Sequence, residues 1–158
     1  MSDVRRTLLF LVTDTDILLA MKKRGFGTGL WNGVGGKLEP GESLEEALVR
    51  ECQEEICVTP TVYHKVAELD FYGGSVEEGW HMFVHAYVCT AWEGEPHETE
   101  EMAPRWFEKS SIPYEQMWQD DQYWVPIVLA GKKIDGTFTF DSNDVLVSHT
   151  VNELKDMQ

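Results

Sequence analysis

Three glutamates, Glu51, Glu54 and Glu55, are the residues whose type and spacing are best suited to chemistry. They lie within residues 44–57, a run without Gly or Pro that is rich in Leu, Ala, Glu and Arg, which is typical of a helix. Ser43 and Glu46 have the spacing of a capping box, so we expect the helix to begin at Ser43. At roughly 100° per residue, Glu51 and Glu55 fall among the apolar positions of this helix, and Glu54 lies just beyond them.

This placement of the carboxylates favours a cation site. Pairs of like charge three or four residues apart repel by roughly 0.2–0.5 kcal/mol even on an exposed helix, and partial burial raises that cost. A solvated acidic face is the alternative, but it does not explain carboxylates among apolar positions. Oxygen ligands that converge from one helix suit Mg²⁺ or Mn²⁺, which bind carboxylates, water and substrate phosphates.

A basic and glycine-rich stretch precedes the helix. Residues 22–24 read Lys-Lys-Arg, and residues 25–29 and 31–36 contain six glycines in all. The stretch is either a connector or a phosphate clamp in which Lys22 or Lys23 contacts the phosphates. Glycine lets the backbone approach a ligand closely, and the Gly36 carbonyl could serve as a ligand for a hard cation.

The adjacent acids Asp120 and Asp121 form a second candidate constellation. They could simply cap a helix or complement its dipole. Two neighbouring carboxylates in a pocket cannot both ionise easily, so one pKa rises and that acid can donate a hydrogen bond. Such a pair would offer one donor and one acceptor, and Asn32 would add an amide that does both.

Length and composition restrict the class of protein. At 158 residues the chain is expected to form one domain, spanning 1–158, with a substantial core. The formal net charge of -15 argues against a nucleic-acid surface binder, although metal ions can still offset the charge of a nucleotide. We find no signal peptide or membrane span, and three cysteines without metal-type spacing indicate free thiols in a reducing compartment.

The remaining chain predicts alternating strands and helices. The expected strands are residues 4–13, 17–23, 61–72, 80–92, 105–107, 134–140 and 144–151. We expect 17–23 to be the hairpin partner of 4–13, and the last two strands to form a closing hairpin. Residues 117–129 predict a helix that is kinked at, or begins near, Pro126. His81 and His85 are expected to be packing or surface residues, and residues 94–102 form an acidic loop. This order implies an α/β sandwich with a mixed sheet.

The glutamate helix also resembles the signature of the Nudix hydrolases. Gly36, Glu42 and the run Arg50-Glu51-Cys52-Gln53-Glu54-Glu55 have its spacing, and Cys57 replaces its final glycine, so the exit from the helix could differ. Four further segments resemble the MutT-homologue branch, which acts on oxidised purine nucleoside triphosphates. They are MKKRGFG, WNGVGGK, EMAPRWF and MWQDDQYWVP, and the likeness runs from about Thr7 to Thr150.

The resemblance implies a Nudix fold, an α/β/α sandwich with a mixed β-sheet. It implies hydrolysis of 8-oxo-dGTP and 2-hydroxy-dATP type nucleotides to the monophosphate and pyrophosphate, with Mg²⁺ (or Mn²⁺) as cofactor. The implied metal ligands are the Gly36 carbonyl, Glu51, Glu54, Glu55 and Glu101, and the catalytic residues are Arg50, Glu51, Glu54 and Glu55. Glu51, Glu54 or Glu101 could act as the base. The implied substrate-binding residues are Thr7, Lys22, Phe26, Asn32, Gly35, Gly36, Lys37, Phe71, Trp118, Asp120 and Asp121.

Gln119 stands where this branch often has proline, which could change how rigidly the aspartates are held, and residues 73–80 match the branch poorly.

Two other functions remain open at this point. One is a Nudix hydrolase of ADP-ribose or a dinucleoside polyphosphate, and the other is a catalytically silent module that senses nucleotides. We expect a monomer that binds a small-molecule nucleotide and neither nucleic acid nor membrane. Its location is expected to be cytoplasmic, with the nuclear or mitochondrial pool as alternatives.

Overall fold

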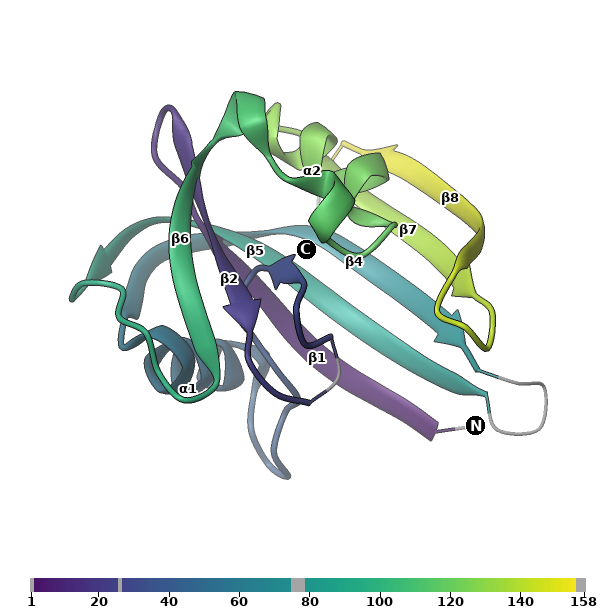
Figure 1. Cartoon of the computed structure of the whole chain (residues 1–158), viewed down its shortest axis with the longest axis horizontal. Helices are drawn as coiled ribbons and strands as arrows, with labels where there is room; N and C mark the ends of the chain where they lie inside the picture. Colours follow the sequence, from purple (N-terminus) through teal and green to yellow (C-terminus); the bar gives the residue numbers. More distant parts are fainter. Residues whose placement is uncertain (1, 26, 75–78, 156–158) are drawn as a thin grey trace.

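The computed structural model describes residues 2–25, 27–74 and 79–155, and its largest element is a five-stranded mixed sheet (Figure 1). In spatial order its strands are β1 (Ser2–Leu11), β5 (Trp80–Glu93), β4 (Thr59–Gly73), β7 (Lys133–Phe140) and β8 (Leu146–Leu154). The β1–β5 and β4–β7 pairs are parallel, and the other two pairs are antiparallel. The mixed sheet confirms the predicted α/β class.

A smaller sheet stands beside this one and contributes to the core on both of its faces. Its strands are β3 (Trp31–Asn32), β2 (Asp16–Lys22) and β6 (Met102–Glu108), in that spatial order. Because side chains alternate along a strand, Leu18 packs in one core cluster while Ile17 and Leu19 pack in the other. The strand β2 is therefore buried on both sides.

The two α-helices cover opposite faces of the large sheet. Leu48 of α1 (Leu44–Ile56) packs in the same cluster as Leu9 of β1. Trp124 of α2 (Asp121–Leu129) packs in the other cluster with Phe10, the next residue of β1. Consecutive strand residues point to opposite faces, so the helices enclose the sheet in an α/β/α sandwich (Figure 1). Across the described residues, neither helix has the length and apolar character that a membrane crossing requires.

The predicted hairpin between residues 4–13 and 17–23 is wrong. The strand β1 pairs in parallel with β5, and its other edge binds the glycine segment through Leu9 N–H to the Val34 carbonyl at 2.7 Å and Thr7 N–H to the Gly36 carbonyl at 2.9 Å. The strand β2 pairs with β6, and it meets the end of β1 only through the turn, with a bridge between Val12 and Ile17 and a hydrogen bond from the Thr13 N–H to the Asp16 carbonyl at 2.9 Å. From Leu8 to Leu11 both faces of β1 are apolar, so this half of the strand lies in the core.

The helix predicted within residues 117–129 begins between the two expected starts, after residue 117 and before Pro126, and runs through Pro126. Met117 forms a β-bridge with Trp31, which keeps the chain extended there, and Tyr114–Gln116 is a 3-10 turn. The helix α2 begins at Asp121, and Pro126 lies inside it. The closing hairpin is confirmed: β7 and β8 pair antiparallel around a turn in which Asp141 accepts hydrogen bonds from the backbone of Asn143 and Val145.

Candidate functional site

The helix α1, which carries Glu51, Glu54 and Glu55, is capped at its N-terminus. The predicted capping box is confirmed, because the Ser43 hydroxyl accepts from the Glu46 N–H at 3.1 Å and the Glu46 carboxylate accepts from the Ser43 N–H at 3.0 Å. Glu55 is 4% exposed, and Glu54 is on the outer side of the helix with a half-exposed side chain. The predicted placement of Glu55 among apolar residues is therefore correct.

The helix ends in the left-handed turn that a glycine would make. Cys57 has a φ of 64°, and its N–H donates to the Gln53 carbonyl at 3.1 Å. The exit from the helix is thus unchanged by the replacement. A residue with a Cβ adopts this conformation at a cost of about 1–2 kcal/mol, and nothing in the structure explains why cysteine stands here.

A glycine segment from β3 runs against these carboxylates. The Gly35 N–H donates to Glu55 Oε1 at 2.7 Å. A Cβ built on Gly36 would lie 2.6 Å from the Glu51 carboxyl carbon, and one on Gly35 would lie 1.9 Å from the Thr7 carbonyl oxygen. Both glycines are needed because the backbone passes directly between β1 and the glutamates: the Cα of Gly36 faces the Glu51 carboxylate, and its carbonyl accepts from the Thr7 N–H of β1 at 2.9 Å.

The site has the electrostatic character of a cation site. Burial raises the pKa of Glu55 to about 8, and the charges of Glu51 and Glu101 add to this, while the Gly35 hydrogen bond opposes it. Burial also raises the pKa of Glu51, against the effect of Arg50. A bound cation would relieve this repulsion. Within the described part of the chain, no three His, Cys, Asp or Glu side chains are gathered closely enough to hold a metal by themselves. Carbonyl, water and phosphate oxygens would complete the shell, as is usual for Mg²⁺.

Arg50 holds the acidic helix to the loop before it. Its guanidinium donates to the Glu42 carboxylate at 2.7 and 2.9 Å, to Glu51 at 2.8 Å and to the Lys37 carbonyl at 3.0 Å. The hydrogen bonds to Arg50 lower the pKa of Glu42 to about 2. Arg50 therefore fixes the orientation of Glu51, and Lys37 participates through its backbone while its side chain is exposed.

The acidic loop at residues 94–101 is tied to the end of α1. The Thr99 hydroxyl donates to the Glu55 carbonyl at 2.9 Å, and the Lys23 N–H donates to the Glu101 carbonyl at 2.9 Å. The charge of Glu101 is close enough to raise the pKa of both Glu51 and Glu55. The loop is thus more than a solvated connector, because it brings Glu101 to the carboxylate cluster.

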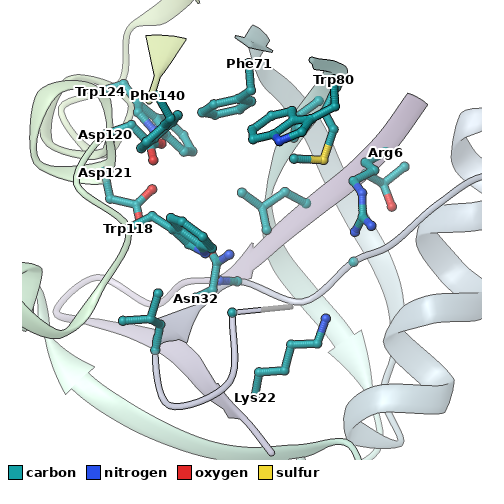
Figure 2. A pocket seen from close by; sticks show the side chains of 18 of the residues that line it. Arg6, Lys22, Asn32, Phe71, Trp80, Trp118, Asp120, Asp121, Trp124 and Phe140 are labelled. Atoms are coloured by element: carbon teal, nitrogen blue, oxygen red, sulfur yellow. The ribbon is translucent and has the colours of Figure 1, made fainter. Parts of the chain in front are cut away.

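A cavity of about 140 Å³ lies between the large sheet, β3 and α2 (Figure 2). It is roughly ten times the minimum volume that holds one water molecule. Eight residues expected to bind substrate line it: Thr7, Lys22, Asn32, Gly35, Phe71, Trp118, Asp120 and Asp121. Gly36 and Lys37 lie outside its lining, and Phe26 lies outside the described residues.

The cavity also contains residues that the sequence did not reveal. They are Arg6, Leu8, Gly27, Leu30, Gly33, Trp80, Met82, Val84, Met102, Trp124 and Phe140. Three of its lining residues have a buried side-chain atom without a hydrogen-bond partner among the described residues, namely Arg6 Nε, Thr7 Oγ1 and Asp121 Oδ2. Leaving a buried polar group unpaired costs about 1–3 kcal/mol, so the cavity is built to receive a polar ligand.

Asp120 and Asp121 form one end of this cavity, where Figure 2 shows them beside Trp124 and Trp118. Both are buried, at 4% and 2% exposure, and Asp120 Oδ2 accepts from Trp124 Nε1 at 2.8 Å. Asp120 precedes α2 but makes no side-chain capping bond. Burial raises the pKa of Asp120 to about 6, and burial together with the charge of Asp120 raises the pKa of Asp121 well above its ordinary value. Helix capping therefore does not account for the pair.

Two neighbouring side chains differ in their freedom to bind a ligand. Lys22 lines the cavity, and its charge opposes the rise in the pKa of Glu55. Lys23 is paired with Glu98 and donates to the Thr99 carbonyl at 2.8 Å. Of the two candidate lysines, Lys22 is the one that faces the cavity.

Gln119 connects the aspartate pair to the closing hairpin. Its side-chain oxygen accepts from the Leu146 N–H at 2.7 Å, and its carbonyl accepts from Gln122 Nε2 at 3.1 Å. These two hydrogen bonds restrain the segment before α2, at the position where the MutT-homologue branch often restrains it with a proline.

His81 and His85 lie away from the cavity. His81 Nε2 is 2.6 Å from the Asp70 carboxylate, and His85 is buried, which lowers its pKa to about 4. Both have the structural character expected from the sequence.

Comparison with known proteins gives matches that agree with this geometry. A family model described as NUDIX domain matches residues 3–127. A Danio rerio protein named "Oxidized purine nucleoside triphosphate hydrolase" is 43% identical over 152 residues, or 96% of each chain. A Mus musculus protein of the same name is 41% identical over 149 residues, or 94% of each chain. The crystal structure of a mMutator MutT protein from Bacillus halodurans superimposes with a TM-score of 0.81 at 26% identity, covering 94% of this chain and 97% of that one.

Proposed function

The chain belongs to the Nudix family of hydrolases, and on this basis we propose that it hydrolyses oxidised purine nucleoside triphosphates to the monophosphate and pyrophosphate. Substrates of the 8-oxo-dGTP and 2-hydroxy-dATP type fit this proposal, and their removal would keep damaged purines out of DNA. The observation that carries it is a cavity with unpartnered buried polar atoms, next to a helix of carboxylates. The Danio rerio and Mus musculus relatives, both named as oxidized purine nucleoside triphosphate hydrolases, support the same substrate class.

The aspartate pair would recognise the edge of the base through hydrogen bonds. With Asp121 protonated and Asp120 ionised, the pair offers one donor and one acceptor, and a proton moved between them exchanges these roles. Asn32 Oδ1 accepts from the Gly33 N–H at 2.8 Å, which leaves the amide N–H groups of Asn32 for the base. A pocket whose donor and acceptor can be exchanged can bind two differently oxidised purines.

Aromatic side chains would hold the faces of the base. Trp118 and Phe71 line the cavity, and Phe71 is itself stacked on Phe138 at a centroid distance of 5.3 Å. Stacking of a base on an aromatic side chain contributes about 1–3 kcal/mol. The packed ring behind Phe71 keeps this wall rigid.

Mg²⁺, or Mn²⁺ in its place, would be held by Glu51, Glu54, Glu55, Glu101 and the Gly36 carbonyl. These are hard oxygen donors, and the repulsion among the buried carboxylates fits a bound cation. When bound, the ion neutralises phosphate charge and activates water. Arg50 positions Glu51 for this task, and Lys22 would contact the phosphates from the side of the cavity.

We also propose that residues 1–158 form one domain that works as a monomer on a cytosolic nucleotide pool. The three free cysteines support a reducing compartment. Light scattering after size-exclusion chromatography tests the oligomeric state.

A nucleotide panel tests the substrate class. Purified protein with Mg²⁺ is expected to release pyrophosphate from oxidised purine triphosphates with a kcat/KM well above that for unmodified dGTP and dATP. Turnover of ADP-ribose or dinucleoside polyphosphates, with none of oxidised purine triphosphates, would refute the proposal. Binding of oxidised purines without turnover in Mg²⁺ would instead indicate a silent sensing module.

A further inference from the structure

Arg6 contributes a positively charged guanidinium to the lining of the cavity. Its Nε is buried and unpaired among the described residues. The nearby acids are engaged elsewhere: Glu51 forms its ion pair with Arg50, and Glu55 accepts from the Gly35 N–H. A charged group left without its hydrogen bond costs more than a neutral one. A ligand is therefore the natural partner for this guanidinium.

The strand β1 directs Arg6 into the cavity. Side chains alternate along a strand, so Arg6 lies on the same face as Leu8, which lines the cavity. On β5, its register partner Val84 lines the cavity as well. On its other edge, the backbone of Arg6 forms a bridge with Lys37, directly after the glycine segment. Arg6 is thus fixed on a rigid element between a wall of the cavity and the glutamate helix.

Arg6 lies between the glutamates of α1 and the aspartate pair at the other end of the cavity. Burial lowers the pKa of Arg6, and the charges of Glu51 and Glu55 oppose that change, so the guanidinium is within electrostatic reach of both. The aspartates lie toward α2 in the same cavity. Figure 2 shows Arg6 and Lys22 on the side next to α1, with their nitrogens turned toward each other.

Resting on the proposed function, we propose that Arg6 binds the α-phosphate, the phosphate that remains on the nucleoside monophosphate product. A nucleotide whose base meets Asp120 and whose outer phosphates meet the glutamates must pass its α-phosphate through the space between them. That space holds Arg6 and Lys22. A guanidinium presents several N–H donors in a planar fork that matches two phosphate oxygens.

Binding measurements with and without the phosphate test this assignment. In EDTA, isothermal titration calorimetry compares 8-oxo-dGMP with the 8-oxo-deoxyguanosine nucleoside for the wild-type protein and the variants Arg6→Gln, Arg6→Lys and Arg5→Gln. Arg5→Gln is the matched control, because Arg5 is an exposed neighbour on the opposite face of β1 and its loss changes the net charge equally. We expect Arg6→Gln to weaken monophosphate binding about tenfold or more and to leave nucleoside binding unchanged.

Each outcome bears on the assignment. Arg6→Lys is expected to retain part of the affinity, because it keeps the charge but not the fork, and Arg5→Gln is expected to retain nearly all of it. An equal loss for nucleoside and monophosphate would show that Arg6 supports the fold or the base pocket, and would overturn the proposal. Unchanged monophosphate binding in Arg6→Gln would overturn it as well. Failure of the wild-type protein to bind any oxidised purine would count against the proposed function itself.

Discussion

Replacing Asp120 by asparagine tests whether the aspartate pair lowers the free energy of unfolding of the ligand-free protein. Burial raises the pKa of Asp120 from its ordinary value of 3.8 to about 6. The native state therefore binds this proton more tightly than the unfolded chain does. The stability that this provides is complete below pH 4 and is lost as the pH rises through 6. At about 1.4 kcal/mol per pH unit, the loss is about 3 kcal/mol above pH 7.

Asp120→Asn removes this ionisation and keeps an oxygen for Trp124 Nε1. The variant is expected to be more stable than the wild-type protein by about 3 kcal/mol at pH 7.5 and by almost nothing at pH 4. The gain is at least this large, because the neutral neighbour lets Asp121 ionise more easily and so reduces the cost of burying that acid. Urea denaturation in EDTA between pH 4 and 8 measures the difference.

The control for this experiment is Asp14→Asn, which removes the same charge from an exposed turn. It is expected to show no such pH-dependent gain. If Asp120→Asn has the same stability as the wild-type protein at pH 7.5, or a lower one, the pair is not strained and the reasoning is refuted. The same variant is expected to lose kcat/KM for one class of oxidised purine far more than for the other. Equal losses for the 8-oxo-dGTP and 2-hydroxy-dATP types would exclude proton exchange within the pair.

Three further substitutions probe the frame around the site. Glu55→Gln is expected to lower kcat by about 100-fold or more, because cation binding is worth several kcal/mol, while circular dichroism stays unchanged; near-normal turnover would remove Glu55 from the metal site. Cys57→Gly is expected to raise the free energy of unfolding by about 0.5–1 kcal/mol, since glycine relieves the left-handed residue and loses part of that gain to unfolded-state entropy; a destabilised variant would mean that the thiol makes a contact of its own. Gln119→Leu removes the acceptor of the Leu146 N–H and is expected to cost about 1 kcal/mol and to raise the KM for the oxidised purine; unchanged stability and KM would show that the bond does not hold the aspartates.

The features predicted correctly are those encoded by local sequence. The capping box at Ser43 and the interleaved Glu55 follow from helical periodicity, and both hold in the structure. The closing hairpin follows from its short polar turn. These signals lie within single short segments of the chain, so no knowledge of distant partners is required.

The incorrect and missing predictions concern features that depend on contacts between segments far apart in the sequence. The apparent hairpin of residues 4–13 and 17–23 loses to parallel pairing of β1 with β5, in which Ser2 lies opposite Trp80, because tertiary packing outweighs proximity in sequence when an apolar strand selects its partner. Arg6 does carry a local signal in the sequence: it stands two positions before Leu8, on an otherwise apolar face of the strand. Trp80 carried no such signal, because its place above Gly73 depends on the β4–β5 register.

Two acidic clusters, the aspartate pair in the lining of the cavity and the glutamates of α1 outside that lining, carry the cost of burying acids. Burial raises the pKa of Glu55 and of Asp121, so each cluster destabilises the empty protein. In the proposed function a cation would relieve the glutamates and the edge of a base would relieve the aspartates, so each ligand would gain affinity from the strain that it removes. A nucleotide bound with its cation would relieve both clusters at once, whereas an unmodified base with the wrong pattern of donors would leave Asp120 and Asp121 unsatisfied. Discrimination would then come from the groups left unpaired with the wrong substrate as much as from the contacts made with the right one.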